Sequence, residues 1–226
     1  MGFQVAIDGP AGAGKSTIAK LVAKELRLIY VDTGAMYRTI GLYMLKNGID
    51  IHDEAAVGAA LPDVSVSIGY DESGLQRLYL NGEDVTALIR TPEVSEAASV
   101  TSAYPKVREK LLDLQHTLAR ENDVVMDGRD IGTVILPDAQ VKIFLTASVR
   151  VRALRRMKEL LEKGEAVSLE MVEQEIRERD YRDSHRETAP LRQAEDAVLL
   201  DTSDLTIEEV ISKAVSLIRP KMAGEE

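Results

Sequence analysis

The sequence predicts an α/β protein in which helices flank a parallel sheet and a small antiparallel sheet is inserted. Short apolar segments alternate with segments of helical periodicity along most of the chain, a pattern typical of a parallel sheet covered on both faces. A glycine-rich turn at residues 9–14 joins the first predicted strand to the first predicted helix. Residues 63–90 differ, because apolar and polar side chains alternate there around turn signals, which indicates antiparallel strands.

Length and composition limit the classes of protein to which the chain can belong. Its 226 residues suit one larger α/β domain or a core with inserted subdomains, and 45% hydrophobic with 29% charged residues argue against wholesale disorder. A formal net charge of −10 argues against a general nucleic-acid binder. The absence of cysteine excludes disulfides, thiolate metal sites and cysteine nucleophiles.

The sequence contains no signal for a membrane or for secretion. No apolar run reaches the length of a membrane span, and the first residues lack the basic and apolar regions of a secretory signal. We therefore expect a cytoplasmic protein without a membrane or nucleic-acid partner. The sequence shows no exposed apolar stripe that a second subunit would have to cover, so we expect a monomer.

The first two predicted strands are each followed by a helix. We assign strands to 3–8 and 29–32 and helices to 15–26 and 35–47. In the first helix, apolar side chains from Ile18 to Leu26 recur at helical spacing, and the second helix ends before Gly48. The chain therefore opens on a strand, a glycine loop and a helix.

The insert and the elements after it follow from similar patterns. In the insert, alternating segments at 64–68 and 77–80 flank a turn at 71–74, and a second tight turn is signalled at 81–82. Later helices are assigned to 91–103, 106–121, 149–163, 169–184 and 206–218, and later strands to 124–126, 141–145 and 197–201. We expect Ser203 or Asp204 to cap the last helix.

The glycine-rich turn matches the phosphate-binding pattern G-x-x-x-x-G-K-[ST]. The matching residues are Gly9, Pro10, Ala11, Gly12, Ala13, Gly14, Lys15 and Ser16. Glycine allows backbone N–H groups to face an anion at the start of the following helix. Lys15 is suited to reach the β- and γ-phosphates and Ser16 to supply its hydroxyl to Mg²⁺. The alternative is a chance match in a flexible loop, but the position between a strand and a helix favours nucleotide binding.

A carboxylate lies at the end of the buried strand at 124–126. Asp127 begins the segment Asp127-Gly128-Arg129-Asp130, and ligands of parallel sheets bind beyond the carboxyl ends of the strands. This position favours Asp127 in the coordination sphere of Mg²⁺ over a purely structural turn.

Ten of the 17 arginines lie between residues 129 and 192, which is unusual in an acidic chain. Phosphoryl transfer brings many negative charges together, and arginine neutralises and orients them. The alternative is a solvated helix face with ion pairs, to which we assign most of Arg150, Arg152 and Arg177. Arg179, Asp183 and Arg186 instead share one helix face and suit a sugar phosphate, although such pairs are often structural.

The segment at 32–38 opens the second helix and allows two interpretations. Asp32 or Thr33 is suited to cap the helix. Alternatively, a hydroxyl, Tyr37 and Arg38 form a second anion site at the helix N-terminus. The chain lacks the N-K-x-D motif that GTPases usually carry, which argues against a GTP switch.

Taken together, these motifs resemble those of the bacterial cytidylate kinase family of nucleoside monophosphate kinases. The resemblance runs over essentially the whole chain and rests on the segments at 7–17, 32–38, 89–94, 127–133 and 179–186. It implies a P-loop kinase core, a monophosphate-binding subdomain with the antiparallel insert, and a helical lid. The implied bounds are 1–31, 109–149 and 186–226 for the core, 32–108 for the subdomain with its insert at about 63–90, and 150–185 for the lid.

The resemblance implies ATP-dependent phosphorylation of CMP or dCMP, with Mg²⁺ as cofactor, and it assigns roles to matching residues. Lys15, Arg129 and Arg186 are the implied catalytic residues. Residues 9–17, from Gly9 to Thr17, bind ATP together with Arg155 and Arg156. The implied cytosine readers are Ser99, Arg108 and Asp130, and the implied ribose contacts are Arg179 and Asp183. The CMP phosphate contacts are Arg38, Arg129 and Arg186, with Tyr37 and Thr33 nearby; Thr33 stands where many relatives have serine.

Two other classes of function remain open. One is another small-molecule P-loop kinase, such as a UMP or shikimate kinase. A hydroxyl acceptor favours a positioned base, whereas a phosphate acceptor favours the arginines found here. The other is a nucleotide-binding regulatory protein, against which the arginine-rich second site argues.

Overall fold

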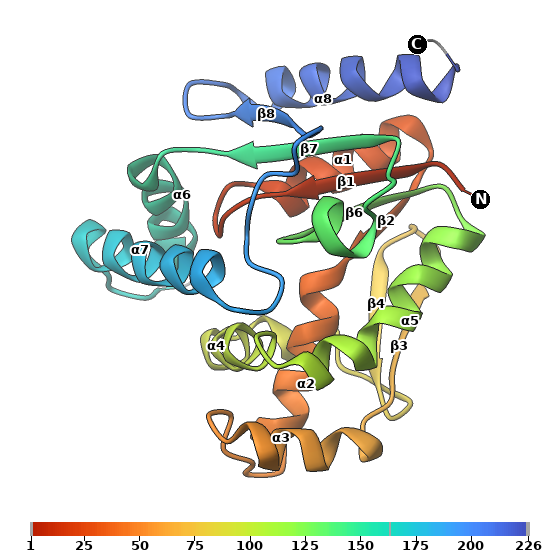
Figure 1. Ribbon diagram of the computed structural model, residues 1–226. Helices are drawn as coiled ribbons and strands as arrows, with labels where there is room; N and C mark the ends of the chain where they lie inside the picture. The colour runs from red at the N-terminus through yellow and green to blue at the C-terminus, as the bar shows by residue number, and fades with distance from the viewer. Residues whose placement is uncertain (1, 163, 225–226) are drawn as a thin grey trace. The chain divides into compact units, whose positions relative to one another are not determined.

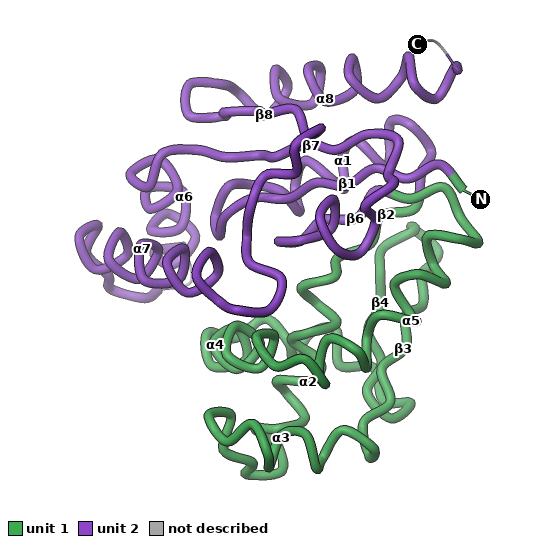
Figure 2. The backbone as a smooth tube through the Cα atoms, in the orientation of Figure 1, with its two compact units in different colours: residues 1–2, 29–124 green, residues 3–28, 125–226 purple. Residues whose placement is uncertain are grey.

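We describe the fold from a computed structural model, which covers residues 2–162 and 164–224. These residues form two compact units (Figure 2). Residues 29–124 make up most of unit 1, and residues 3–28 together with those from 125 onward make up unit 2. Residues 1, 163, 225 and 226, which fall within the predicted core and lid segments, lie outside the described residues.

Unit 2 is built on a sheet with helices around it (Figure 1). Its strands lie in the order β6 (Val124–Gly128), β1 (Gln4–Asp8), β7 (Val141–Thr146) and β8 (Val198–Asp201). The pairs β1–β7 and β7–β8 are parallel, with Ile7 opposite Ile143 and Leu145 opposite Leu200. β1 and β6 are buried along their whole length, which explains their uninterrupted apolar sequences and confirms the predicted parallel sheet.

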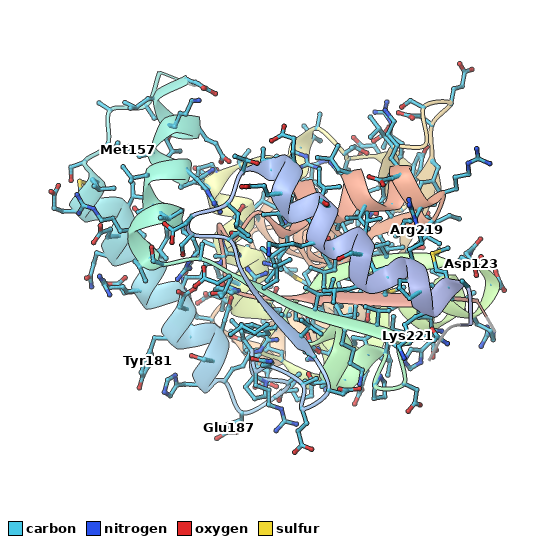
Figure 3. The ribbon with its side chains drawn as sticks, turned by 90° about the horizontal axis from the view of Figure 1, so that it is seen from above. Asp123, Met157, Tyr181, Glu187, Arg219 and Lys221 are labelled. Atoms are coloured by element: carbon cyan, nitrogen blue, oxygen red, sulfur yellow. The ribbon has the colours of Figure 1, made fainter. Side chains whose placement is uncertain are left out.

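Four long helices complete unit 2 and follow the predicted bounds within a few residues. They are α1 (Lys15–Leu26), α6 (Val149–Glu162), α7 (Leu169–His185) and α8 (Ile207–Met222). α6 and α7 pack against each other through Ala153, Leu160, Val172 and Ile176. α8 lies next to α1, and Arg219, which Figure 3 labels near the end of α8, forms an ion pair with Glu25 of α1 at 3.3 Å.

Unit 1 begins with one strand and continues into helices and a hairpin. Its elements are β2 (Ile29–Asp32), α2 (Thr33–Lys46), α3 (Glu54–Ala60), η1 (Leu61–Asp63), β3 (Val66–Tyr70), β4 (Gln76–Leu80), β5 (Glu83–Asp84), η2 (Leu88–Arg90), α4 (Pro92–Thr101) and α5 (Pro105–Glu121). α2 and α4 pack closely at Gly41, where a Cβ atom would lie 3.0 Å from the backbone nitrogen of Ala98.

The antiparallel insert is confirmed as the sheet β3-β4-β5. The Asp71 carboxylate accepts backbone N–H bonds from Ser73 and Leu75 and so closes the turn between β3 and β4. At the second turn, Asn81 and Gly82 have φ values of 50° and 86°, the left-handed conformation that a tight hairpin turn requires.

The structure corrects two details of the sequence prediction and divides the chain differently from a third. α3 was not predicted, because its short, alanine-rich sequence has no clear apolar period. Thr206 caps α8, in place of Ser203 or Asp204, through reciprocal hydrogen bonds with Glu209. The predicted boundary between residues 108 and 109 falls inside α5, which unit 1 keeps whole.

No helix within the described residues is both long and apolar enough to cross a membrane.

Candidate active site

The phosphate-binding loop connects β1 to α1, as the sequence predicts. Gly9 has a φ of +150°, and a Cβ atom there would lie 1.9 Å from the carbonyl oxygen of Leu145 on β7, so no other residue fits. Gly14 precedes α1 with a φ of +90°, a conformation that side chains rarely adopt. The loop therefore takes its shape from glycines at the two ends of the motif.

Three basic side chains bind the carbonyl oxygens of the loop. Lys15 Nζ donates to the oxygen of Pro10 at 2.8 Å, and Arg152 Nη1 donates to that of Ala11 at 2.9 Å. Arg155 Nη1 lies 3.5 Å from the oxygen of Ala13. Because a trans peptide directs its N–H opposite to its C=O, the N–H groups after Ala11 and Ala13 are turned away from the two arginines. These N–H groups are available to an anion.

The ammonium group of Lys15 lies in a buried and strongly charged environment. Burial lowers its pKa to about 7, and the nearby positive charge of Arg129 acts in the same direction. The carboxylates of Asp127, Asp8 and Asp183 oppose this shift. A bound polyphosphate would supply the negative charge that favours the protonated lysine.

Ser16 and Asp127 lie side by side at the start of α1 and the end of β6. Ser16 Oγ donates to Asp127 Oδ2 at 2.8 Å. A hydroxyl and a carboxylate are the hard oxygen ligands that Mg²⁺ prefers, usually as one or two protein ligands beside water and phosphate. The residues present therefore fit a magnesium ion.

Asp8, at the end of β1, contacts the segment that follows β6, a contact that the sequence analysis missed. Its Oδ1 accepts the backbone N–H of Ile131 at 2.8 Å and its Oδ2 that of Gly132 at 2.7 Å. These N–H groups begin the helical turn η3 (Ile131–Ile135) and have no partner within it. Burial raises the pKa of Asp8 to about 6.

Two ion pairs join the residues after β6 to those at the end of α7. Arg129 Nε binds Asp183 Oδ2 at 2.8 Å, and Arg186 Nη2 lies 3.6 Å from Asp130 Oδ1. Burial opposes the charge of both Arg129 and Asp183, but their mutual attraction raises the pKa of Arg129 and lowers that of Asp183. Arg179 and Arg186 also lower the pKa of Asp183. Arg179 and Asp183 thus share one face of α7 as predicted, whereas Arg186 lies just past the end of the helix in extended backbone and is not part of that face.

α7 presents this charged face on one side only. Val172, Ile176 and Asp183 are buried along it, and Arg179 is partly buried. Tyr181, which Figure 3 labels, lies on the exposed side of α7, where its ring stacks on that of His185, and is 63% exposed. The same side that packs on α6 therefore carries the predicted substrate residues.

The arginines of α6 differ in their surroundings. Arg152 is 4% exposed and binds both carboxylate oxygens of Asp180 on α7, in addition to Ala11, so it joins both helices to the phosphate loop. Arg155 also donates to Thr202 after β8 at 2.9 Å. Arg156 forms an ion pair with Glu159 along the helix, outside this cluster. Arg150 and Arg177 both pair with Glu173, as expected for structural ion pairs.

In unit 1, the predicted anion-binding segment is a capped helix start. The Asp32 carboxylate accepts the N–H of Ala35 at 2.8 Å and binds Arg38 at 2.9 Å, so Asp32 is the cap of α2. A Cβ atom at Gly34 would lie 3.2 Å from both side chains, and glycine therefore permits this approach. Arg38 Nε is buried and has no hydrogen-bond partner among the described residues.

The remaining predicted residues of unit 1 lie on α2, α4 and α5. The Arg108 guanidinium stacks over the Tyr37 ring at 5.6 Å and donates to the carbonyl oxygen of Ser102 at 3.3 Å. Ser99 is on α4, and its hydroxyl is buried without a hydrogen-bond partner in the described part of the chain. Thr33 is the first residue of α2.

The predicted site residues are thus gathered in two sets. Unit 2 holds the phosphate loop, Asp127, Arg129, Asp130, Arg155, Arg179, Asp183 and Arg186. Unit 1 holds Thr33, Tyr37, Arg38, Ser99 and Arg108. The structure adds Asp8 and Arg152, whose contacts lie far away in sequence and leave no local motif.

A phosphate loop with its buried lysine and adjoining Ser–Asp pair defines a P-loop nucleotide-binding protein, and the surrounding arginines are typical of phosphoryl transfer. The family model described as cytidylate kinase matches residues 5–220. The chain belongs to the cytidylate kinase family.

Named relatives agree with this assignment, and a solved structure has a similar fold. The chain is 52% identical over 219 residues to a protein of Lactobacillus johnsonii named cytidylate kinase, covering 97% of this chain and 95% of the relative. It is 50% identical to one of the same name from Carboxydothermus hydrogenoformans, covering 97% and 98%. A crystal structure of an uncharacterized protein from Eubacterium ventriosum matches with a TM-score of 0.54 at 10% identity, covering 96% and 98%, and shows the fold alone.

Proposed function

We propose that this protein transfers the γ-phosphoryl group of ATP to CMP and dCMP, giving ADP with CDP or dCDP. The observation that carries the proposal is the pairing of Arg129 with Asp183 and of Arg186 with Asp130, in the same unit as the phosphate loop. Such a set suits an acceptor that is itself an anion. Membership of the cytidylate kinase family and relatives of that name support the choice of CMP.

The reaction needs charge neutralisation more than it needs a base. A nucleoside monophosphate has a second pKa near 6, so its phosphate is largely a dianion at pH 7 and attacks without losing a proton. The oxygen attacks the γ-phosphorus in line as the bond to the β-phosphate oxygen breaks, and ADP leaves. Lys15, Arg129 and Arg186 stabilise the negative charge that spreads over the transferred group.

ATP is bound by the phosphate loop. In this proposal the N–H groups of residues 9–17 hold its phosphates, and Arg155 and Arg156 contact the rest of the nucleotide. Arg155 supports this role because it already lies against Ala13 of the loop. Ser16 and Asp127 would hold Mg²⁺, which would supply positive charge beside the phosphates of ATP.

CMP is bound by residues of three kinds. Cytosine is read by Ser99, Arg108 and Asp130, where Asp130 accepts from the exocyclic amino group and Arg108 donates to the ring. Arg179 and Asp183 contact the ribose. Arg38, Arg129 and Arg186 bind the phosphate, with Tyr37 and Thr33 beside it. The buried Ser99 hydroxyl and Arg38 Nε, both without a partner in the described residues, support their assignment to a ligand.

Water is the competing acceptor in such a reaction. We propose that residues 150–185, which carry α6 and α7, form the lid that limits access of water to the γ-phosphate. Arg152 supports this role because it binds both Asp180 on α7 and Ala11 of the loop. We further propose that the protein acts as a cytoplasmic monomer.

A coupled assay of ADP release tests the proposed function. Mg²⁺-ATP is offered with CMP, dCMP, UMP, AMP, GMP and shikimate in turn. The proposal predicts the highest kcat/KM with CMP and dCMP. Folded, ATP-binding protein that is more active on UMP or shikimate would indicate another small-molecule kinase, and ADP release that no acceptor stimulates would indicate a regulatory protein.

A further inference from the structure

Asp8 connects two segments that are far apart in the sequence and both belong to the proposed site. It is the last residue of β1 and directly precedes Gly9, the first residue of the phosphate loop. Its two oxygens each accept one backbone N–H, from Ile131 and from Gly132. Both distances, 2.8 and 2.7 Å, are short for N–H donors, as expected when the acceptor is charged.

The residues bound by Asp8 directly follow the cytosine-reading and phosphate-binding residues. Asp130 immediately precedes Ile131, and its carbonyl oxygen accepts the N–H groups of Val134 and Ile135. The backbone from Asp130 onward is therefore fixed by hydrogen bonds on two sides. A displacement of Ile131 would move Asp130, and with it the ion pair to Arg186.

The surroundings leave this contact little freedom. Asp8 is 4% exposed. A Cβ atom at Gly132 would lie 3.1 Å from Cδ of Lys142 on β7 and 3.4 Å from Oδ2 of Asp8, so glycine allows the close approach of η3 to the Lys142 side chain, with Asp8 in van der Waals contact. The close packing restricts relaxation if one of the two hydrogen bonds is lost.

We propose that Asp8 is a positioning residue for cytosine recognition: it fixes the backbone of residues 130–132 and so holds the Asp130 carboxylate where the base is read. The inference rests on the proposed function. Asp8 itself touches neither substrate; it acts through Asp130. A purely structural role would instead affect stability, or the use of every substrate equally.

The test replaces Asp8 by asparagine and compares substrates at pH 8. Asp8→Asn keeps the size of the side chain but presents an NH₂ group to one of the two backbone N–H groups, which then loses its acceptor. We expect the ratio of kcat/KM for CMP to that for UMP to fall by about tenfold, through a higher KM for CMP. The loss of the Asp8 charge near Lys15 acts on both substrates alike and cancels in this ratio.

A matched control is available on another strand of the same sheet. Asp201 ends β8 and likewise accepts a backbone N–H, from Ser203 at 2.9 Å. Asp201→Asn is the same chemical change and should leave the CMP:UMP ratio at the wild-type value. A fall of the same size in this variant would show that the effect is unspecific and would overturn the proposal.

A second variant covers the case in which Asp8→Asn does not fold. Gly132→Ala places a methyl group 3.1 Å from Cδ of Lys142 and 3.4 Å from Asp8 Oδ2. This crowding should displace the backbone of residue 132 and lower the ratio in the same direction, by less. An unchanged ratio in folded Asp8→Asn, or in Gly132→Ala if the first variant is unfolded, overturns the proposal. If wild-type protein does not phosphorylate CMP, the proposed function fails and this inference fails with it. If wild-type protein phosphorylates CMP but the variants keep the wild-type CMP:UMP ratio, only this inference fails.

Discussion

At the scale of single residues, the proposed chemistry depends most on Lys15. Its ammonium group is buried at the phosphate loop, where it donates to Pro10. Lys15→Ala should lower kcat by roughly 10²-fold or more, because it removes a cation directed at the transferred phosphoryl group. Lys24→Ala, on the exposed side of the same helix, is the control and should leave kcat unchanged. Steady-state rates with CMP and Mg²⁺-ATP provide the comparison, and near-normal turnover in Lys15→Ala would refute the role of the loop.

Asp130 is the residue on which base selection is proposed to depend. UMP lacks the exocyclic amino group from which Asp130 is proposed to accept a hydrogen bond. Asp130→Ala should therefore lower the preference for CMP over UMP by roughly tenfold to a hundredfold. ATP binding should change little, since Asp130 is assigned no contact with ATP. Substrate competition and ATP titration measure the two effects. Weaker ATP binding with intact CMP preference would remove Asp130 from the base site.

The buried Asp8 carboxylate also predicts a pH dependence of stability. Burial raises its pKa to about 6 in the folded protein, against 3.8 in the unfolded chain. Between these values the folded state binds more protons, so the Asp8 contribution to the free energy of unfolding falls as the pH rises, by about 3 kcal/mol in all. Urea unfolding measures the difference in the free energy of unfolding between wild type and Asp8→Asn, in which the other titrating groups cancel. This difference should fall by about 2 kcal/mol between about pH 4.5 and 7. A difference that does not change with pH would contradict the raised pKa.

The site residues that sequence reasoning found are those with a local signature. The phosphate loop is contiguous, and Asp127 directly follows the apolar residues 124–126 that begin β6. Asp8 has partners 123 and 124 positions away, and Arg152 binds a loop residue 141 positions away. Contacts of this kind depend on the folded chain, so no spacing in the sequence could reveal them.

At the scale of elements, the antiparallel hairpin stabilises the start of α2. Gln76 on β4 accepts the backbone N–H of Asp32 at 2.7 Å and donates to its carbonyl oxygen at 3.2 Å. Tyr70 on β3 donates to the carbonyl oxygen of Tyr30. The insert therefore fixes the residue that caps α2 and binds Arg38.

This contact can be tested by removing the amide. Gln76→Leu removes the acceptor of the Asp32 backbone N–H and one of the donors to its carbonyl oxygen, and should lower the free energy of unfolding by about 1–3 kcal/mol. It should also raise the KM for CMP severalfold, because Arg38 loses its fixed partner. Arg77→Gln on the same strand removes a surface ion pair with Asp71 and is expected to change both quantities little. Equal effects of the two substitutions would contradict a specific role of Gln76.

Most elements were predictable because the periodicity of the apolar residues and the turn residues at the ends of the elements indicated the same bounds. α1 and β2 match their predicted bounds, since a glycine loop and an apolar strand delimit them. α3 was missed because its sequence lacks an apolar period, and the cap of α8 was misplaced because several polar residues precede it. A helix is capped by the residue whose side chain accepts a backbone N–H of the first turn, and the local composition does not show which of several polar residues does so.

At the scale of the whole molecule, the fold class and the insert were predictable, but the division into units was not. The sequence analysis ended the subdomain at residue 108, whereas unit 1 continues to residue 124 and includes all of α5. α5 has buried residues from Val107 to Ala119, so its packing continues across the implied boundary. Sequence motifs locate residues with a chemical role, whereas the compact units depend on contacts within the folded chain.

The whole protein should respond to CMP in the absence of ATP. A ligand that binds only the folded state at 100 times its Kd adds about 2.7 kcal/mol, which corresponds to a rise in Tm on the order of 5 to 10 °C. Thermal unfolding with CMP, and with GMP as the control, measures this shift. Arg186→Ala should reduce the shift with CMP while leaving that with ATP intact. Protection by ATP alone would favour a regulatory nucleotide-binding protein.

The most direct test of phosphoryl transfer to CMP follows the phosphorus atoms themselves. Wild-type protein is incubated with Mg²⁺-ATP and CMP, and the reaction is observed by ³¹P NMR. We predict that ATP and CMP decrease together while ADP and CDP appear in equal amounts, with little inorganic phosphate. ADP formed with inorganic phosphate, while the CMP signal stays constant, would show that the γ-phosphoryl group goes to water and would contradict the proposed function.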